Sequence, residues 1–315
     1  CKAKGRTLDY TASAGALAAA MFQCRLSFHP AMPRRPPFAP PRPQPRWSAL
    51  PVGHWRWWYA VVGVALSLGL LFALVLLGWV GVWGQVAQFL MFIAVALAVP
   101  WAIGRRALAA DWGWVPARPW RTAVVVAVLA VVIFAVVEAI EAVDPAAAQA
   151  SATVMRSFGL GHDTVFDLAL VLCIVALAPL GEELLFRGLI YRSLRDGLAR
   201  HGPLGWGVAV GAAVSAGLFA WAHGGEGQAQ QLWQLVGVGL VLVLAYELTG
   251  SISAPILLHS LNNTLALATG LARYPDVRLA QPWIEALAWA GPLLTLLSIL
   301  LLAALYRRAL RPDLA

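Results

Sequence analysis

Long apolar segments follow one another along most of the chain, with short polar segments between them. They show no alternation of apolar and polar positions with a period of two, which the strands of a barrel would need. Because lipid admits only helices and closed barrels, the segments predict membrane-spanning helices of about 20 residues each. Eight spans are expected, at residues 57–80, 84–104, 120–142, 164–191, 204–222, 232–247, 252–271 and 284–306.

The composition points the same way and argues against a soluble or disordered protein. Hydrophobic residues make up 60% of the 315 residues and charged residues only 12%, and the mean hydropathy is +0.73. A soluble core cannot hide so many apolar side chains, because the surface of a folded chain grows too quickly relative to its volume. We therefore predict an all-α, polytopic membrane protein with about eight transmembrane helices and an active site in the core of the bundle.

The first 54 residues differ from the rest of the chain. The stretch 30–51 is rich in Pro and Arg, which is incompatible with a helix interior, so we predict a disordered cytoplasmic arm. The chain starts with Cys, and translation could instead begin at Met21 or Met32. The predicted regions are the arm (1–54), the first three transmembrane helices (55–150), the catalytic helices four to seven (151–275), and the last helix with a basic cytoplasmic tail (276–315).

Basic residues gather in alternate loops, and the net charge is +8. This pattern predicts that both termini are cytoplasmic, and it excludes nucleic acid as a partner because the arginines lie in short loops between apolar spans. A composition rich in Ala, Arg, Trp and Pro is typical of a GC-rich bacterium, which places the protein in the inner (plasma) membrane. The basic loop and tail residues are Arg105, Arg106, Arg118, Arg121, Arg192, Arg195, Arg200, Arg307, Arg308 and Arg311.

Three clusters of polar residues interrupt the spans: GEELLFRG at 181–188, FAWAH at 219–223 and HSLNN at 259–263. Ionisable groups inside a membrane cost about 2.5–3.5 kcal/mol each on insertion scales, which makes them candidates for function. In the first cluster, Glu183 and Arg187 have the spacing of a helical ion pair. Glu182 is left without a local partner, an environment that suits a general base.

Counting residues along the predicted helices places the three clusters at the same depth in the membrane. The fourth and fifth spans form a hairpin that turns at 201–203, so His223 is expected opposite Glu182. His259 lies about seven residues into the seventh span, and Asn263 follows one turn later on the same face. Three segments that are not adjacent in the chain therefore deliver these four side chains to one layer.

This constellation predicts the activation of water for the hydrolysis of an acyl bond, with a peptide as the favoured target. A carboxylate and a histidine can polarise water, and a second histidine and an asparagine can donate hydrogen bonds to an oxyanion. No cofactor is required on this interpretation. Alternatively, Glu182, His223 and His259 could bind a divalent metal such as zinc, which would acidify the water. The HExxH motif of other zinc proteases and the GxSxG motif of serine hydrolases do not occur in the sequence.

At these residues the chain resembles the CPBP family of intramembrane endopeptidases, the CAAX prenyl protease and bacteriocin-processing family. The signature covers roughly residues 164–271, and it includes a Tyr-Glu-x-Thr-Gly-Ser turn before the last motif. The residues that carry the resemblance are Glu182-Glu183-x-x-x-Arg187, Phe219-x-x-x-His223 and His259-x-x-x-Asn263.

The resemblance implies a helical membrane protease whose site opens to the cytoplasmic side. Glu182 would be the general base, working with His223, and His259 and Asn263 would form the oxyanion site. The eukaryotic branch of the family removes the last three residues of prenylated CAAX proteins, and other members process peptides or confer immunity to them. The expected partners are therefore a peptide or lipidated protein and the lipid bilayer. The residues that would support the site are Glu183, Arg187 and Phe219.

Two other classes of function remain open at this point. The same cavity could bind a partner without catalysis, in an immunity or scaffold protein. Intramembrane Glu and His also serve proton relays, so a proton-coupled transporter is a further alternative, although the sequence has no internal repeat. The residues do not specify the substrate, the cleavage site, metal dependence or the oligomeric state.

Overall fold

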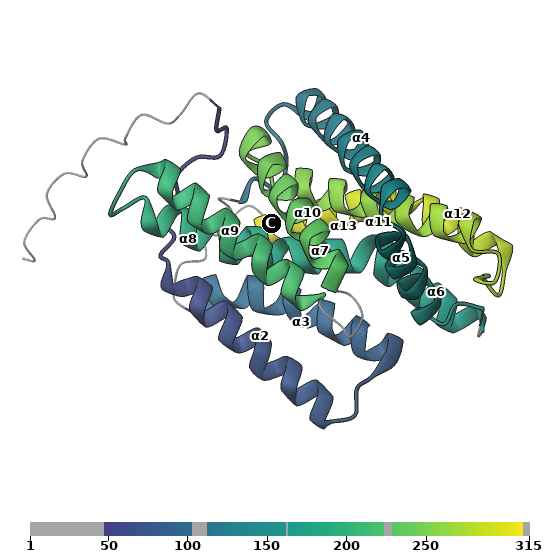
Figure 1. The fold of residues 1–315 in the computed structure, drawn as a ribbon. Coiled ribbons are helices and arrows are strands. Elements are labelled where there is room, and N and C mark those ends of the chain that lie inside the picture. The colour runs from purple at the N-terminus through teal and green to yellow at the C-terminus, as the bar shows by residue number, and fades with distance from the viewer. Residues whose placement is uncertain (1–46, 103–111, 162, 224–228, 311–315) are drawn as a thin grey trace, which may run out of the picture. The chain divides into compact units, whose positions relative to one another are not determined.

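A computed structural model describes residues 47–102, 112–161, 163–223 and 229–310, and its regular structure in these ranges is entirely helical. The all-α prediction is therefore confirmed. Residues 1–46 of the predicted arm, together with Arg105, Arg106 and Arg311, lie outside the described residues. The helices are α2 (Trp58–Leu76), α3 (Gly81–Ala102), α4 (Pro119–Val143), α5 (Pro145–Ser157), α6 (Thr164–Leu172), η2 (Cys173–Leu177), α7 (Ala178–Glu183), η3 (Leu184–Tyr191), α8 (Arg192–Leu198), α9 (Leu204–Ala222), α10 (Ala229–Thr249), α11 (Ser253–Arg273), α12 (Pro282–Trp289) and α13 (Gly291–Leu310) (Figure 1).

Six helices in the described part of the chain are long and apolar enough to cross a membrane, and a seventh span results if α12 and α13 count as one. This supports an integral multi-pass membrane protein, but the count of eight spans is not confirmed. The last predicted span is broken by a bend of 54° between α12 and α13. α11 is 21 residues long but is not among the six, since polar side chains such as His259, Asn262 and Asn263 lower its hydropathy.

One long helical segment forms the centre of the bundle. It runs from Thr164 to Leu198 through α6, η2, α7, η3 and α8, and it is 50% buried, against 11–33% for the other five spans. α3 packs against α7 and η3, α9 packs against η3 and α8, and α11 packs against η2 and α7 (Figure 1). The GEELLFRG cluster therefore lies where neighbouring helices cover it on several sides.

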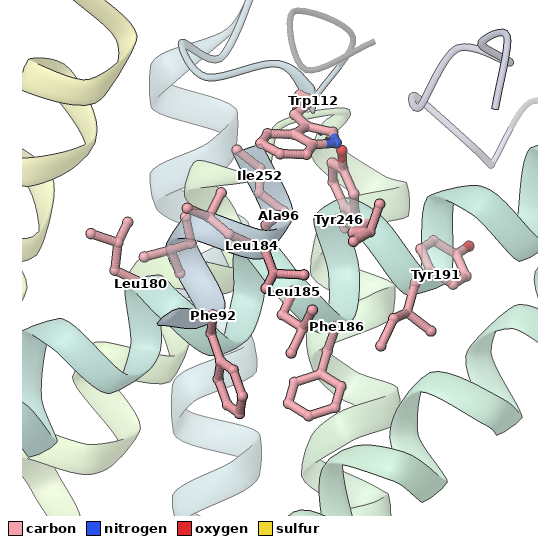
Figure 2. Packing of buried hydrophobic residues seen from close by; sticks show 14 of the residues in the cluster. Phe92, Ala96, Trp112, Leu180, Leu184, Leu185, Phe186, Tyr191, Tyr246 and Ile252 are labelled. Atoms are coloured by element: carbon pink, nitrogen blue, oxygen red, sulfur yellow. Dashed lines mark hydrogen bonds between the residues drawn. The ribbon is translucent and has the colours of Figure 1, made fainter. Parts of the chain in front are cut away.

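Large apolar side chains fill the space around this central segment. Leu180, Leu184 and Phe186 project from it into a cluster with Phe92 of α3 (Figure 2). The Phe186 ring meets Phe92 edge-on at 6.2 Å and Phe219 of α9 edge-on at 5.6 Å. This packing fixes the segment against α3 and α9, so the polar groups on its remaining face have a defined position.

The boundary predicted for the N-terminal arm is wrong for residues 47–54, because these residues pack against α8 and α10. The backbone N–H of Ala49 donates to the carbonyl of Glu247, at 2.7 Å, and that of Gly53 donates to the Asp196 carboxylate, at 2.9 Å. Leu50 is fully buried. The Pro and Arg content made this segment look unstructured, but its partners lie more than 140 residues away in the chain.

A close approach of α8 and α9 yields a first prediction. A Cβ placed on Gly207 would lie 2.2 Å from the backbone oxygen of Arg195, whereas one on Gly217 of the same helix would meet nothing within 4 Å. Gly207→Ala is expected to lower the free energy of unfolding by about 1–3 kcal/mol, because backbone cannot move aside. Gly217→Ala is expected to raise it by about 0.5–1 kcal/mol. Denaturant unfolding in detergent checks both, and an equal response of the two variants would contradict the described packing.

Candidate active site

Each of the three polar clusters occupies a defined place on the helices. GEELLFRG spans the junction of α7 and η3. FAWAH closes α9, and His223 is the residue at its C-terminal cap. HSLNN lies in the middle of α11. The site is therefore built from the α7–η3 junction, the C-terminal end of α9 and the middle of α11.

The Glu182 carboxylate lies between the two histidines. One of its oxygens is 3.7 Å from Nε2 of His223, and the other is 3.8 Å from Nε2 of His259. The side chains of Glu182 and His259 are only 6% and 4% exposed, but His223 is 34% exposed. Among the described residues, Oε2 of Glu182 is buried without a hydrogen-bond partner. A separation above 3.5 Å between polar groups is the distance that a bridging water fills.

Glu183 and Arg187 form a buried ion pair beside this carboxylate. Nη1 of Arg187 donates to Oε1 of Glu183 at 2.8 Å, and both side chains are fully buried. The same Glu183 oxygen is 3.0 Å from Nδ1 of His259, and Nη2 of Arg187 donates to the carbonyl of Gly239 in α10, at 3.1 Å. A carboxylate at Nδ1 fixes the orientation of a histidine and favours a proton there, which leaves Nε2 facing Glu182.

The Phe219 ring lies between the cation and the histidines. The Arg187 guanidinium lies over it, 4.5 Å from the ring centroid. Its centroid is 4.6 Å from that of His223 and 5.6 Å from that of His259. His223 is also held through its ring, since Nδ1 lies 2.8 Å from the Phe219 carbonyl, one helical turn earlier. The Phe219 ring therefore packs against the charged and histidine side chains, and its backbone carbonyl contacts His223.

Asn263 has a backbone partner in the central segment. Its amide Nδ2 donates to the carbonyl of Ile174 in η2 at 2.9 Å, and its Oδ1 is 3.4 Å from Nδ2 of Asn262. A primary amide has two N–H groups, so at most one remains for an oxyanion. The structure thus brings together Glu182, Glu183, Arg187, Phe219, His223 and His259, and it places Asn263 one turn along α11 with a contact of its own.

The side chains named for a metal do not form a metal site in the described part of the chain. No group of three or more His, Cys, Asp or Glu residues there is arranged to hold a metal ion. The two Nε2 atoms face different oxygens of the Glu182 carboxylate at 3.7 and 3.8 Å, which is longer than a direct hydrogen bond.

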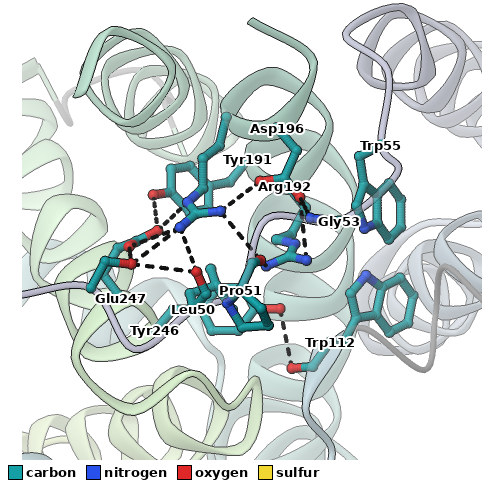
Figure 3. Close-up of polar contacts among 12 residues, drawn as sticks. Leu50, Pro51, Gly53, Trp55, Trp112, Tyr191, Arg192, Asp196, Tyr246 and Glu247 are labelled. Carbon is teal, nitrogen blue, oxygen red and sulfur yellow. Dashed lines mark hydrogen bonds and ion pairs between the residues drawn. The ribbon is translucent and has the colours of Figure 1, made fainter. Parts of the chain in front are cut away.

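A second buried polar cluster was not predicted from the sequence. Arg192 and Arg195 were assigned to a basic loop, but both lie in α8 and are fully buried, so the assignment to a loop is wrong. Nε of Arg195 lies 2.5 Å from the Glu247 carboxylate, and its Nη1 donates to Asp196 at 2.6 Å. The Tyr191 hydroxyl donates to the same Glu247 oxygen, Oε1, at 2.6 Å (Figure 3).

This ionic cluster also binds the segment 47–55. Nη2 of Arg195 donates to the Leu50 carbonyl at 2.7 Å, and Nη1 of Arg192 donates to that of Pro51 at 2.9 Å. The Trp55 ring stacks on Trp112 at 5.9 Å (Figure 3). The spacing of Arg192 and Asp196, four residues apart, was the one signal in the sequence that could have indicated a buried pair.

The comparisons with known proteins support the resemblance over the same segment. Residues 164–265, about a third of the chain, match the model of the Rce1-like family, described as type II CAAX prenyl endopeptidase Rce1-like. Over this segment the resemblance to the CPBP family is therefore confirmed. A curated protein of Escherichia coli, described as an uncharacterized 24.3 kDa protein, is 35% identical over 100 residues. That alignment covers 32% of this chain and 43% of the relative. No solved structure matches the chain.

Proposed function

Because residues 164–265 are similar to a family of membrane-embedded endopeptidases, we propose that the protein is an intramembrane endopeptidase. Its substrates would be membrane-associated or lipidated polypeptides. One observation carries the proposal: a buried carboxylate, Glu182, faces Nε2 of two histidines across gaps of 3.7 and 3.8 Å. We propose that this carboxylate and the two ring nitrogens bind the attacking water molecule.

In the proposed reaction, Glu182 accepts a proton from the water as the water oxygen attacks the peptide carbonyl carbon. The new C–O bond converts the carbonyl oxygen to an oxyanion, which is stabilised by the remaining N–H of Asn263 and by His259 when both of its ring nitrogens carry a proton. The C–N bond then breaks, and Glu182 returns its proton to the amine that leaves. His223 orients the water. The products are a carboxylic acid and an amine, so one water is consumed for each bond cut.

The burial of the groups indicates how a substrate would enter. His223 is the exposed member of the site, whereas Glu182, Glu183 and His259 lie behind it. We propose that a polypeptide substrate enters the site on the side of His223, whose side chain is 34% exposed. We propose that this side faces the cytoplasm, that both termini are cytoplasmic, and that the membrane is the bacterial inner membrane.

The proposal can be tested with the purified full chain in lipid nanodiscs. The protein is incubated with a panel of peptides, with and without a C-terminal lipid, and the products are identified by mass spectrometry. We expect cleavage by the wild type and none by Glu182→Gln at equal amounts of folded protein. Cleavage that persists in Glu182→Gln would overturn the proposal, and no cleavage by either form would favour a scaffold or a transporter.

The donor geometry also predicts how the activity responds to metal chelators. Since the described residues assemble no metal site, incubation with EDTA or 1,10-phenanthroline is expected to leave cleavage unchanged. Added zinc is expected to give no increase. The measurement is the initial rate before and after dialysis against chelator, with a known zinc protease as the positive control. A loss that zinc restores would show that the carboxylate and histidines bind a metal.

A further inference from the structure

The central helical segment contains an interruption directly before Glu182. In η2 the hydrogen bonds have the wider spacing of a π-helix, and the N–H of Ala178 donates to the carbonyl of Cys173, five residues back. The next residue, Pro179, has no N–H to donate. In an α-helix the Ile174 carbonyl would accept from the N–H of Ala178, but that N–H donates to Cys173 instead. In a π-helix it would accept from residue 179, which is a proline and has no N–H. The carbonyl of Val175 loses its α-helical partner, which is Pro179 itself.

Side chains from two other helices satisfy these carbonyls. Asn263 of α11 donates to the Ile174 carbonyl at 2.9 Å. Ser260, also of α11, donates to the Val175 carbonyl at 2.5 Å. Thr295 of α13 lies 3.2 Å from the same carbonyl and 3.0 Å from the Ser260 hydroxyl. In a helix surrounded by lipid and protein, such carbonyls have no water to accept from, so these bonds hold the helices together.

The packing around this contact is tight. Ser260 and Thr295 are fully buried. A Cβ placed on Gly291, the first residue of α13, would lie 2.6 Å from Cβ of Val175, so glycine permits α13 to approach η2 closely. The two hydroxyls therefore contact η2 in a buried, closely packed region.

The contact links the two halves of the candidate site. Val175 precedes Glu182 by seven residues on one helical segment, and Ser260 follows His259 directly on another. We propose that Ser260 and Thr295 are positioning residues, which set Glu182 relative to His259 by holding the turn that Pro179 interrupts. This inference rests on the proposed function where it is tested by kcat. The NMR measurement of His259 described below does not depend on that function. Thr295 also lies outside the family-matched segment 164–265.

The test combines hydroxyl deletions with a matched control and a rescue. Ser260→Ala and Thr295→Val are each expected to lower kcat about 10-fold and to change KM less than about twofold, since the reacting groups are displaced but the binding surface is kept. Thr295→Ser is expected to restore the rate. Ser298→Ala is the control on α13, because that hydroxyl donates to Leu294 of its own helix at 2.9 Å.

Pro179→Ala gives a second, independent arm. This change restores the backbone N–H of residue 179, which can donate to the carbonyl of Val175 or Ile174 within the helix. The deletion of a hydroxyl should then lower kcat less. We expect Thr295→Val to lower kcat less than about threefold in the Pro179→Ala background, a coupling that a general loss of stability would not produce. An unchanged kcat in both deletions, or an equal loss in Ser298→Ala, would overturn the proposal.

A spectroscopic readout separates this inference from the proposed function. The imidazole nitrogen signals of His259 are recorded by NMR in the chain labelled with ¹⁵N-histidine, with His259→Gln for assignment. Thr295→Val is expected to shift these signals and Ser298→Ala to leave them in place. If the wild type cleaves no peptide, the proposed function fails, and the NMR measurement alone tests the positioning role. His259 signals that do not shift in Thr295→Val would then overturn that role.

Discussion

Glu182→Gln is expected to lower kcat for peptide cleavage by about 10³-fold, within the range measured for the removal of a general base. The amide has the shape of the carboxylate, so the packing against His223 and His259 is kept. It cannot accept a proton from water at neutral pH, so the attacking hydroxide is not generated. KM is expected to change little, because substrate binding does not depend on that proton transfer.

Glu285→Gln is the matched control for this prediction. It makes the same chemical change at an exposed position of α12 and is expected to leave kcat and KM unchanged. The kinetics are compared at equal amounts of folded protein, measured by size-exclusion chromatography in detergent. A Glu182→Gln enzyme that keeps more than about a tenth of the wild-type kcat would show that another group is the base.

Arg195→Met is expected to destabilise the protein by about 3–5 kcal/mol, as does the removal of one partner from other buried ion pairs. Arg195 contacts Glu247 at 2.5 Å and Asp196 at 2.6 Å, and all three side chains are buried. Without the guanidinium, the buried Glu247 carboxylate has no cation beside it, whereas Asp196 keeps Arg192 at 3.3 Å. The Leu50 carbonyl loses its donor as well, so the segment 47–55 should detach together with the loss of stability.

Denaturant unfolding in detergent measures this effect, and limited proteolysis near residue 50 reports the detachment. Arg156→Met is the control, because Arg156 pairs with Asp276 at 2.7 Å on an exposed surface. The hydrogen bond from Arg156 holds the pKa of Asp276 below its ordinary value, but solvent screens the pair, so no measurable loss is expected. The double variant Arg195→Met/Glu247→Leu should recover part of the stability, since it removes the carboxylate that Arg195→Met leaves without a cation. Equal losses in Arg195→Met and Arg156→Met would contradict the described burial.

The meeting of the polar clusters could be predicted because it depends on simple helix geometry. A hairpin with a short turn places residues at equal distances from the turn side by side, and this puts His223 next to Glu182 at 3.7 Å. The i,i+4 rule gave the Glu183–Arg187 pair. Both relations involve residues on one helix or on two consecutive helices.

Contacts between segments far apart in the chain could not be predicted in the same way. The burial of Arg192 and Arg195 requires the segment 47–55, which lies about 140 residues earlier in the chain. Pro179 accounts for the interruption of the helix before Glu182. The carbonyl that it leaves without a backbone donor, that of Val175, accepts from side chains on α11 and α13, which are distant in the sequence. The short helix α5, which begins at the Asp144 cap, has too few apolar residues to be recognised as a span.

The most direct test of the account compares polypeptide termini in cell membranes. Membranes are prepared from cells that express the wild type or Glu182→Gln at equal levels, and the N- and C-termini of the membrane proteins are mapped by mass spectrometry. The account predicts a small set of new termini, in membrane-associated or lipidated polypeptides, that occurs only with the wild type. Identical sets of termini from the two membranes would contradict it.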